Sequence, residues 1–104
     1  MKPTYTKVFP SLWQGTLRGQ GVAQLVFLYM LGNADAEGTF DEHPQAIVDA
    51  TGFSLAEIRS AIEVLEGPDH ESRSPADEGR RIRLMDSHRT WGWRLVNHAK
   101  YRER

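Results

Sequence analysis

The sequence contains no cysteine, and this absence excludes disulfide bonds and metal sites built on thiolates. Long apolar segments are also missing, because the longest run, at residues 22–31, is interrupted by Gln24 and is too short to cross a bilayer. Residues 1–7 lead into no apolar stretch of the kind found in a signal peptide. These absences predict a cytoplasmic protein without a membrane-spanning segment.

Motifs for catalysis or cofactor binding are missing as well. The histidines stand singly and form no H-E-x-x-H or similar metal-binding pair. They are His43, His70, His88 and His98. The glycines at positions 15, 19 and 21 lack the G-x-G-x-x-G order and the G-K-[ST] ending that phosphate-binding loops require, and no serine stands beside a base in a nucleophile motif. We therefore expect no enzyme, no metal ion and no other cofactor.

The charge that is present is unevenly distributed. The formal net charge of the chain is −1, but residues 1–70 contain four basic and nine acidic residues, whereas residues 71–104 contain nine basic and five acidic residues. The first part therefore carries a net charge of −5 and the last part a net charge of +4. This polarity favours contact with nucleic acid, although an ordinary solvated surface can show it too.

Residues 54–66 carry a complete set of helix signals. Ser54 and Glu57 have the spacing of a capping box, and Phe53 is placed to pack on Ile58. Four apolar residues share one helix face, and Gly67-Pro68 ends the helix. The four residues expected to face the core are Leu55, Ile58, Ile62 and Leu65. The residues expected to point outward are Ala56, Glu57, Arg59, Ser60, Glu63 and Glu66.

The length of 104 residues predicts one domain, which divides into five segments. The segments are an extended lead-in at 1–15 with a short strand at 5–9, a helical core at 20–66, a polar loop at 67–79, a hairpin at 80–97 and a basic tail at 98–104. The helical core contains an apolar helix at 20–34, a short strand at 39–40 and a helix at 45–51, opened by His43-Pro44 and closed by Gly52. The helix at 45–51, the turn at Gly52-Phe53 and the helix at 54–66 together predict a helix-turn-helix.

The hairpin is predicted by two segments of alternating character. In residues 80–85 two apolar residues alternate with arginines, and in residues 91–97 three apolar residues share one face. These residues are Ile82, Leu84, Trp91, Trp93 and Leu95. The spacing favours core positions for the tryptophans over a platform that stacks single-stranded bases. The element order predicts an α+β winged helix-turn-helix, with three helices and a small antiparallel β-hairpin as the wing.

Several stretches narrow this prediction to a family. They are residues 6–9 (TKVF), residues 29–31 (YML) with Ala34-Asp35, residues 72–82 (SRSPADEGRRI) and residues 92–102 (GWRLVNHAKYR). This pattern, which spans about residues 6–102, resembles the N-terminal winged-helix domain of phage and prophage replication proteins of the replisome-organiser type. The resemblance implies binding to origin DNA in a bacterial host cell, with a linker and a region that binds a helicase or helicase loader following the domain.

Basic side chains of the hairpin and tail are the main candidates for contact with double-stranded DNA, because wings lie along the phosphate backbone. Arg59 is the one cation among the outward positions of the 54–66 helix, and Ser60 is a weaker donor beside it. The full candidate set is Arg59, Ser60, Arg80, Arg81, Arg83, Arg89, Arg94, Lys100 and Arg102. Alternatively, some arginines pair with Asp77, Glu78 and Asp86, Arg94 props an edge of the core, and Glu63 pairs with Arg59.

Two other functions fit the same sequence. An acidic helix face suits a protein partner better than DNA, so the domain is also a candidate protein-interaction module of a phage, acting as an inhibitor or adaptor. Its interface would contain Glu57, Glu63, Glu66 and Asp69. A phage transcriptional regulator would share the DNA chemistry and differ in the site bound. The sequence determines neither that site nor the oligomeric state.

Overall fold

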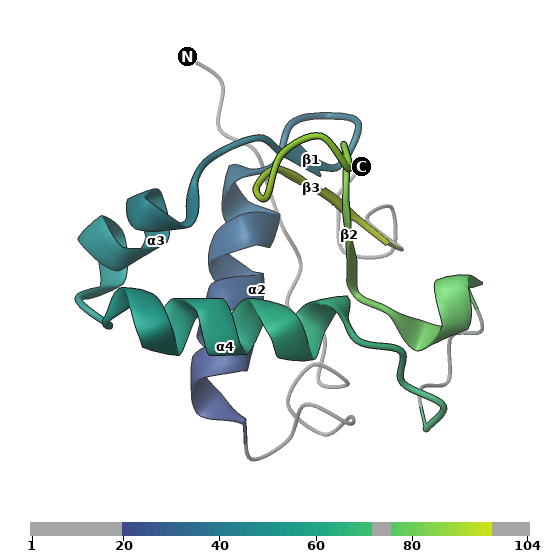
Figure 1. Ribbon diagram of the computed structural model, residues 1–104, viewed down its shortest axis with the longest axis horizontal. Helices are drawn as coiled ribbons and strands as arrows, with labels where there is room; N and C mark the ends of the chain where they lie inside the picture. Colours follow the sequence, from purple (N-terminus) through teal and green to yellow (C-terminus); the bar gives the residue numbers. More distant parts are fainter. Residues whose placement is uncertain (1–19, 72–75, 97–104) are drawn as a thin grey trace.

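The computed structural model describes residues 20–71 and 76–96, which form an α+β arrangement of three α-helices and a small antiparallel sheet (Figure 1). The elements in order are α2 (Gly21–Asn33), β1 (Thr39–Phe40), α3 (Pro44–Thr51), α4 (Leu55–Glu66), a 3-10 helix η1 (Ala76–Gly79), β2 (Ile82–Leu84) and β3 (Trp93–Leu95). In Figure 1, α4 crosses α2, α3 lies at the N-terminal end of α4, and β2 lies toward its C-terminal end. The lead-in and strand expected within residues 1–15 and the tail at 98–104 lie outside the described residues.

The starts of α3 and α4 follow the predicted capping signals. Glu57 N–H donates to Ser54 Oγ at 3.1 Å, and Ser54 N–H donates to Glu57 Oε1 at 3.0 Å, so the capping box is confirmed. Pro44 occupies the first turn of α3, where Gln45 N–H donates to the Nδ1 atom of His43 at 3.0 Å. Gly52 ends α3 in the left-handed region with φ of 81°. Local chemistry therefore determines where α3 begins and ends and where α4 begins.

The core is built where α2 and α4 cross and the sheet closes over them. α2 contributes buried side chains from several sides, as its almost continuous apolar sequence predicts. The largest fully buried side chains are Trp93, Phe27, Phe40, Met30, Ile47, Ile58, Leu65 and Ile82. These come from the three α-helices and the three strands, so one core joins these six elements.

The sheet has three strands, in the order β1-β3-β2. The predicted hairpin is present, with Ile82 opposite Leu95 and Leu84 opposite Trp93, and the strand at 39–40 joins it by pairing with β3. The hairpin strands are shorter than the predicted segments 80–85 and 91–97. One reason is that Arg81 N–H donates to the carbonyl of Leu65 at the end of α4, at 3.1 Å, so the chain turns toward the helix there.

Leu55, which was predicted to face the core, does not do so fully, and Leu84 of the hairpin is exposed to a similar extent. Leu55 is 40% exposed and Leu84 is 37% exposed. Ala61 is buried instead, together with Ile58 and the other two predicted positions of α4. The buried stripe is centred on the middle and C-terminal turns of α4, because α2 crosses the helix there, and Leu55 lies at its edge.

Glu66 also departs from its predicted outward position. Its side chain is half-buried, and its Oε2 atom accepts a hydrogen bond of 2.7 Å from Nε1 of Trp93. Trp93 is 1% exposed, so its indole N–H needs an acceptor inside the protein. The prediction that Glu66 belongs to the solvated face of α4 is therefore wrong, because β3 lies against this end of the helix.

Trp91 and Trp93 differ in their environments. Trp93 is buried and packs beside Phe40, with ring centroids 6.4 Å apart. Trp91 precedes β3 and is half-buried at the border of the core. The prediction of a core role is confirmed for Trp93 and holds only in part for Trp91.

Within residues 20–71 and 76–96, the helices are too short or too polar to cross a bilayer.

The capping box can be tested by Ser54→Ala. This substitution removes the acceptor for Glu57 N–H, and we expect the free energy of unfolding to fall by about 1 kcal/mol. Urea unfolding followed by circular dichroism measures the change. Ser60→Ala on the same helix is the matched control and should change the value by less than about 0.5 kcal/mol. Equal losses in the two variants would contradict a capping role for Ser54.

Candidate nucleic-acid interface

Most arginines of the predicted DNA-binding set form ion pairs within the domain. Nη1 of Arg80 lies 3.0 Å from Oε1 of Glu78 and 3.6 Å from Oδ1 of Asp77. Nη1 of Arg81 lies 3.0 Å from Oδ2 of Asp69, and both of these side chains are largely buried. The predicted pairing of arginines with Asp77 and Glu78 is therefore confirmed for Arg80.

The acidic partners sit in an unusual turn. Asp77 and Glu78 of η1 have φ values of 52° and 56°, in the left-handed region that few residues other than glycine and asparagine adopt readily. Asp69 N–H donates to the carbonyl of Glu78 at 2.8 Å and ties this turn to the chain that follows α4. Asp77 is not a solvated charge. It lies between Arg80 and Arg83 with most of its side chain covered.

Arg89 is held at the base of the loop between β2 and β3. Its Nη2 atom lies 2.7 Å from Oδ1 of Asp41, and its guanidinium lies 4.0 Å from the ring centroid of Trp91. His43 lies on the same tryptophan, with ring centroids 6.1 Å apart. Arg89 thus connects the loop to the segment between β1 and α3. Asp86, which was among the acidic residues predicted to pair with arginines, instead accepts a hydrogen bond of 2.9 Å from the backbone N–H of His88.

Gly92 makes this arrangement possible. Its φ is 91°, and a Cβ atom at this position would lie 2.9 Å from Nη2 of Arg89 and 3.1 Å from Oδ1 of Asp41. Sequence reasoning did not find Asp41 or Gly92, because the contact joins residues 48 positions apart. The only local signal is a glycine placed between two tryptophans, Trp91 and Trp93.

Arg83 and Arg94 form a second kind of basic site. They are cross-strand partners in the β2–β3 register, and both side chains are exposed. The neighbours of Arg94 on β3 are both buried, whereas on β2 only Ile82 is buried beside Arg83. Nε of Arg83 lies 3.3 Å from Oδ2 of Asp77, yet 63% of the Arg83 side chain remains exposed. Arg94 forms no ion pair with any residue that the structure describes. The alternative in which Arg94 props the core is wrong, because its side chain is exposed.

The α4 surface is less basic than the hairpin. Arg59 is half-buried, and the predicted ion pair between Arg59 and Glu63 is absent although both residues are described. Ser60 lines an open groove between α4 and the first turn of α2. The two DNA-binding candidates of this helix therefore do not share one environment. Lys100 and Arg102 lie outside the described residues.

The predicted acidic interface is divided among several structural roles. Glu57 accepts the capping hydrogen bond from Ser54, Glu66 accepts from Trp93, and Asp69 pairs with Arg81. Glu63 is exposed and forms no side-chain hydrogen bond or ion pair with the described residues. Three of the four carboxylates thus already have a partner inside the domain.

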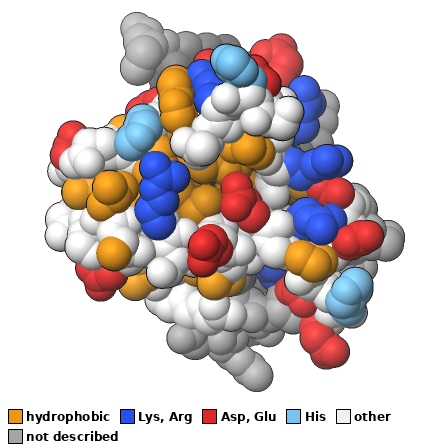
Figure 2. All heavy atoms as spheres, viewed as in Figure 1, with side chains coloured by type: hydrophobic (Ala, Val, Ile, Leu, Met, Phe, Trp, Pro, Cys, Tyr) orange, Lys and Arg blue, Asp and Glu red, His pale blue; other side chains and the backbone are white. Residues whose placement is uncertain are grey.

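Charge on the described part of the chain is predominantly negative. Residues 20–71 and 76–96 contain six arginines, no lysine and thirteen acidic residues, a net formal charge of −7. Figure 2 shows several basic side chains at the right of the face and others at the top and left of centre, with acidic side chains among them. The basic residues of this surface are therefore interspersed with carboxylates rather than collected into one continuous patch.

Within residues 20–71 and 76–96, no three histidine, aspartate or glutamate side chains form a group that could hold a metal ion. Of the four histidines, His43 caps α3, His70 and His88 are exposed, and His98 lies outside the described residues.

Substitution of Gly92 tests the cluster at the base of the loop. Gly92→Ala places a methyl group against the Arg89–Asp41 pair at a positive φ, and we expect the free energy of unfolding to fall by more than about 1 kcal/mol. Gly32→Ala in α2 is the matched control, because nothing lies within 4 Å of the added Cβ there. It should raise the free energy of unfolding by about 0.5–1 kcal/mol. Equal values from urea unfolding would show that Gly92 is not constrained by the cluster.

Comparison of the chain with known proteins finds no match among family models, curated proteins or solved structures.

Proposed function

We propose that this domain is a winged helix that binds double-stranded DNA. Arg83 and Arg94 of the hairpin hold backbone phosphates, and α4 lies toward the major groove. The resemblance of the sequence to replisome-organiser proteins assigns this binding to the initiation of phage DNA replication, in the cytoplasm of a bacterial host. The domain performs no catalysis and needs no cofactor in this role.

The topology supports the fold part of the proposal. The chain runs from α2 through β1 to the helix pair α3 and α4 and then into the β2–β3 hairpin, and β1 pairs with β3. α3 and α4 are joined by the short turn that follows Gly52, as in a helix-turn-helix. A hairpin that follows the second helix of this motif has the position of a wing.

The observation that carries the DNA part is the register of Arg83 and Arg94. Like charges placed directly opposite each other in a sheet repel and lower stability. A phosphate oxygen between the two guanidinium groups would remove this repulsion and accept charge-assisted hydrogen bonds from both. The exposed face of the hairpin therefore has the chemistry of a phosphate site, and of these two arginines only Arg83 is reached by Asp77.

α4 contributes fewer contacts to the proposed complex. Arg59 can donate to a guanine edge or to a phosphate. The remaining affinity would come from Lys100 and Arg102, which follow the hairpin in the sequence. The hairpin and tail would thus supply most of the binding free energy, and α4 would adjust the position on DNA.

The negative charge of the described residues limits the affinity. Ion pairs hold Arg80, Arg81 and Arg89 in place, so these residues neutralise carboxylates rather than phosphates. With about five phosphates contacted, the slope of log K against log salt concentration should be about −4 to −5. We therefore expect binding that is weak at physiological salt and considerably tighter at low salt.

Two other functions remain as alternatives to this proposal. The charge of −7 on the described residues favours a protein-interaction module, but the carboxylates predicted for that interface are mostly engaged in contacts within the domain. A helicase, a helicase loader or another phage or host protein would then bind Glu63 and its surroundings. A transcriptional regulator would use the same arginines and would be distinguished by a binding site in a promoter.

Replacement of both hairpin arginines tests the phosphate site. Arg83→Ala/Arg94→Ala should weaken binding to a labelled duplex by about tenfold or more and make the salt slope less steep by about two units. Fluorescence anisotropy at several salt concentrations measures both values. Circular dichroism of the variant confirms that the fold is retained.

Single substitutions provide the control for charge. Arg80→Ala removes the same charge as Arg94→Ala, but its guanidinium is shared by Glu78 and Asp77, so its effect should be less than about threefold. Equal effects of the two substitutions would reject a specific phosphate site at Arg94. Absence of binding of any duplex by the folded wild-type domain at low salt would reject DNA binding itself.

The protein-interaction alternative is tested by Glu63→Lys. If the domain binds DNA, this substitution removes a repulsive charge from α4 and should strengthen binding about fivefold, with a steeper salt slope. If α4 docks on a basic protein, the same variant should lose that protein while Arg94→Ala retains it. Pull-down from infected-cell extract, compared between the two variants, measures the second outcome.

A further inference from the structure

Asp77 places a carboxylate beside one of the two arginines that are proposed to hold phosphates. Its Oδ2 atom lies 3.3 Å from Nε of Arg83, and its Oδ1 atom lies 3.6 Å from Nη1 of Arg80. The side chain of Asp77 is 21% exposed, whereas that of Arg83 is 63% exposed. The arginine can therefore turn toward a ligand in solvent while the carboxylate stays covered.

The contact between Asp77 and Arg83 is close but incompletely formed. Oδ2 of Asp77 is covered, yet it accepts no hydrogen bond from any residue that the structure describes. Charge-assisted hydrogen bonds are the strong form of an arginine–anion contact, and this pair lacks one. A phosphate oxygen that meets Arg83 with good geometry would therefore form the better bond.

The turn that carries Asp77 holds the carboxylate in this position. Asp77 and Glu78 have φ values of 52° and 56°, and residues other than glycine are strained in this region. Backbone hydrogen bonds maintain the turn, because Arg80 N–H donates to the carbonyl of Asp77 at 3.0 Å and Asp69 N–H donates to the carbonyl of Glu78 at 2.8 Å. The chain thus tolerates backbone strain at the point where a carboxylate reaches the hairpin.

We propose that Asp77 is an autoinhibitory carboxylate, which occupies Arg83 in the free protein and loses it to a backbone phosphate when DNA binds. This inference rests on the proposed function, because it concerns the arginines of the hairpin. Binding exchanges the contact of Arg83 with Asp77 for a contact with phosphate and leaves Asp77 facing Arg80. The net gain at Arg83 is therefore smaller than at Arg94, which has no carboxylate to give up within the described residues.

The carboxylate and the phosphate are alternatives because they do the same work. Arg83 and Arg94 are directly opposite in the sheet, and like charges in this position repel. In the free protein the charge of Asp77 offsets part of this repulsion. A bound phosphate would offset it instead, and the two anions would repel each other if both stayed at Arg83.

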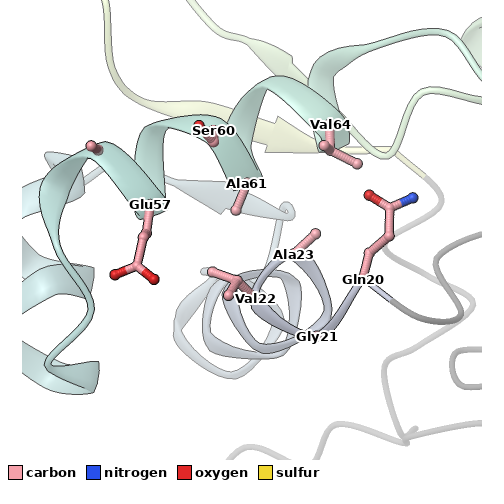
Figure 3. Close-up of a pocket in the computed structure, with 9 residues that line it drawn as sticks. Gln20, Gly21, Val22, Ala23, Glu57, Ser60, Ala61 and Val64 are labelled. Atoms are coloured by element: carbon pink, nitrogen blue, oxygen red, sulfur yellow. The ribbon is translucent and has the colours of Figure 1, made fainter.

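α4 has no comparable competitor for its cation. Arg59 forms no ion pair with the residues that the structure describes. The groove between α4 and the first turn of α2 is lined by a single carboxylate, that of Glu57, and by no arginine (Figure 3). Glu57 already accepts a hydrogen bond from Ser54 in the capping box. Among the described cations of the proposed site, Arg83 alone has a carboxylate to exchange for phosphate.

Replacement of the carboxylate by its amide tests the inference. Asp77→Asn removes the charge at nearly constant shape, and asparagine enters the left-handed region more readily than most residues, so the turn should be retained. At low salt, where charges are least screened, we expect this variant to bind a labelled duplex about three- to fivefold more tightly than the wild-type chain. In an Arg83→Ala background the same substitution should change the affinity by less than about twofold. Fluorescence anisotropy measures all four affinities.

Glu78→Gln is the matched control, because it removes the same charge from the neighbouring residue, whose carboxylate contacts Arg80. It should change the affinity by less than about twofold. Asp77→Gly provides a second variant, which removes the charge and the backbone strain together and should give the same gain as Asp77→Asn. Circular dichroism confirms the fold of each variant.

Three results would overturn the inference while DNA binding by the wild-type chain stands. They are an unchanged affinity in both Asp77 variants, equal gains from Asp77→Asn and Glu78→Gln, and a gain that persists without Arg83. The first would show that the carboxylate does not compete, the second that only net charge matters, and the third that Asp77 acts elsewhere. Absence of duplex binding by the folded wild-type chain at low salt would instead reject the proposed function and this inference together.

Discussion

The hydrogen bond from the indole of Trp93 to the carboxylate of Glu66 is the contact on which the rest of the structure depends. Trp93 lies on β3, the central strand, and packs beside Phe40 of β1. A buried indole N–H without an acceptor would cost about 1–3 kcal/mol, so the core requires a polar partner at this point. The 2.7 Å bond to Glu66 supplies it and fixes the last turn of α4 against the sheet. The same contact removes one carboxylate from the surface of α4.

Electrostatic pairing determines which arginines are available for a ligand. Arg81 and Arg89 connect distant parts of the chain through Asp69 and Asp41, so their side chains have structural roles. The side chains of Arg83 and Arg94 are exposed, and neither connects distant parts of the chain in this way. Surface ion pairs contribute only about 0–1 kcal/mol each, so phosphates can compete for Arg83 at little cost. The proposed DNA site is therefore smaller than the basic sequence indicates, and its affinity should respond strongly to salt.

The faces of α4 have different structural roles because each face has different neighbours. Ile58 and Leu65 pack in the core, whereas Ala56 and Ser60 border a groove that the first turn of α2 completes. Small residues on this side keep the helices from filling the space between them. Arg59 is the one cation of α4, so this helix would contribute less to the proposed DNA binding than the hairpin.

The sequence by itself determined the elements whose signals are local. The capping box at Ser54, the left-handed glycine at Gly52 and the alternation around Trp93 are each defined by residues a few positions apart, and the structure confirms them. The tertiary structure decided the roles of the charged residues. Asp41 meets Arg89 across 48 positions and Glu66 meets Trp93 across 27, and no local pattern encodes such pairs. Which arginines remain exposed depends on how α4, η1 and the sheet pack together, because a carboxylate neutralises only the cation that the fold brings within reach.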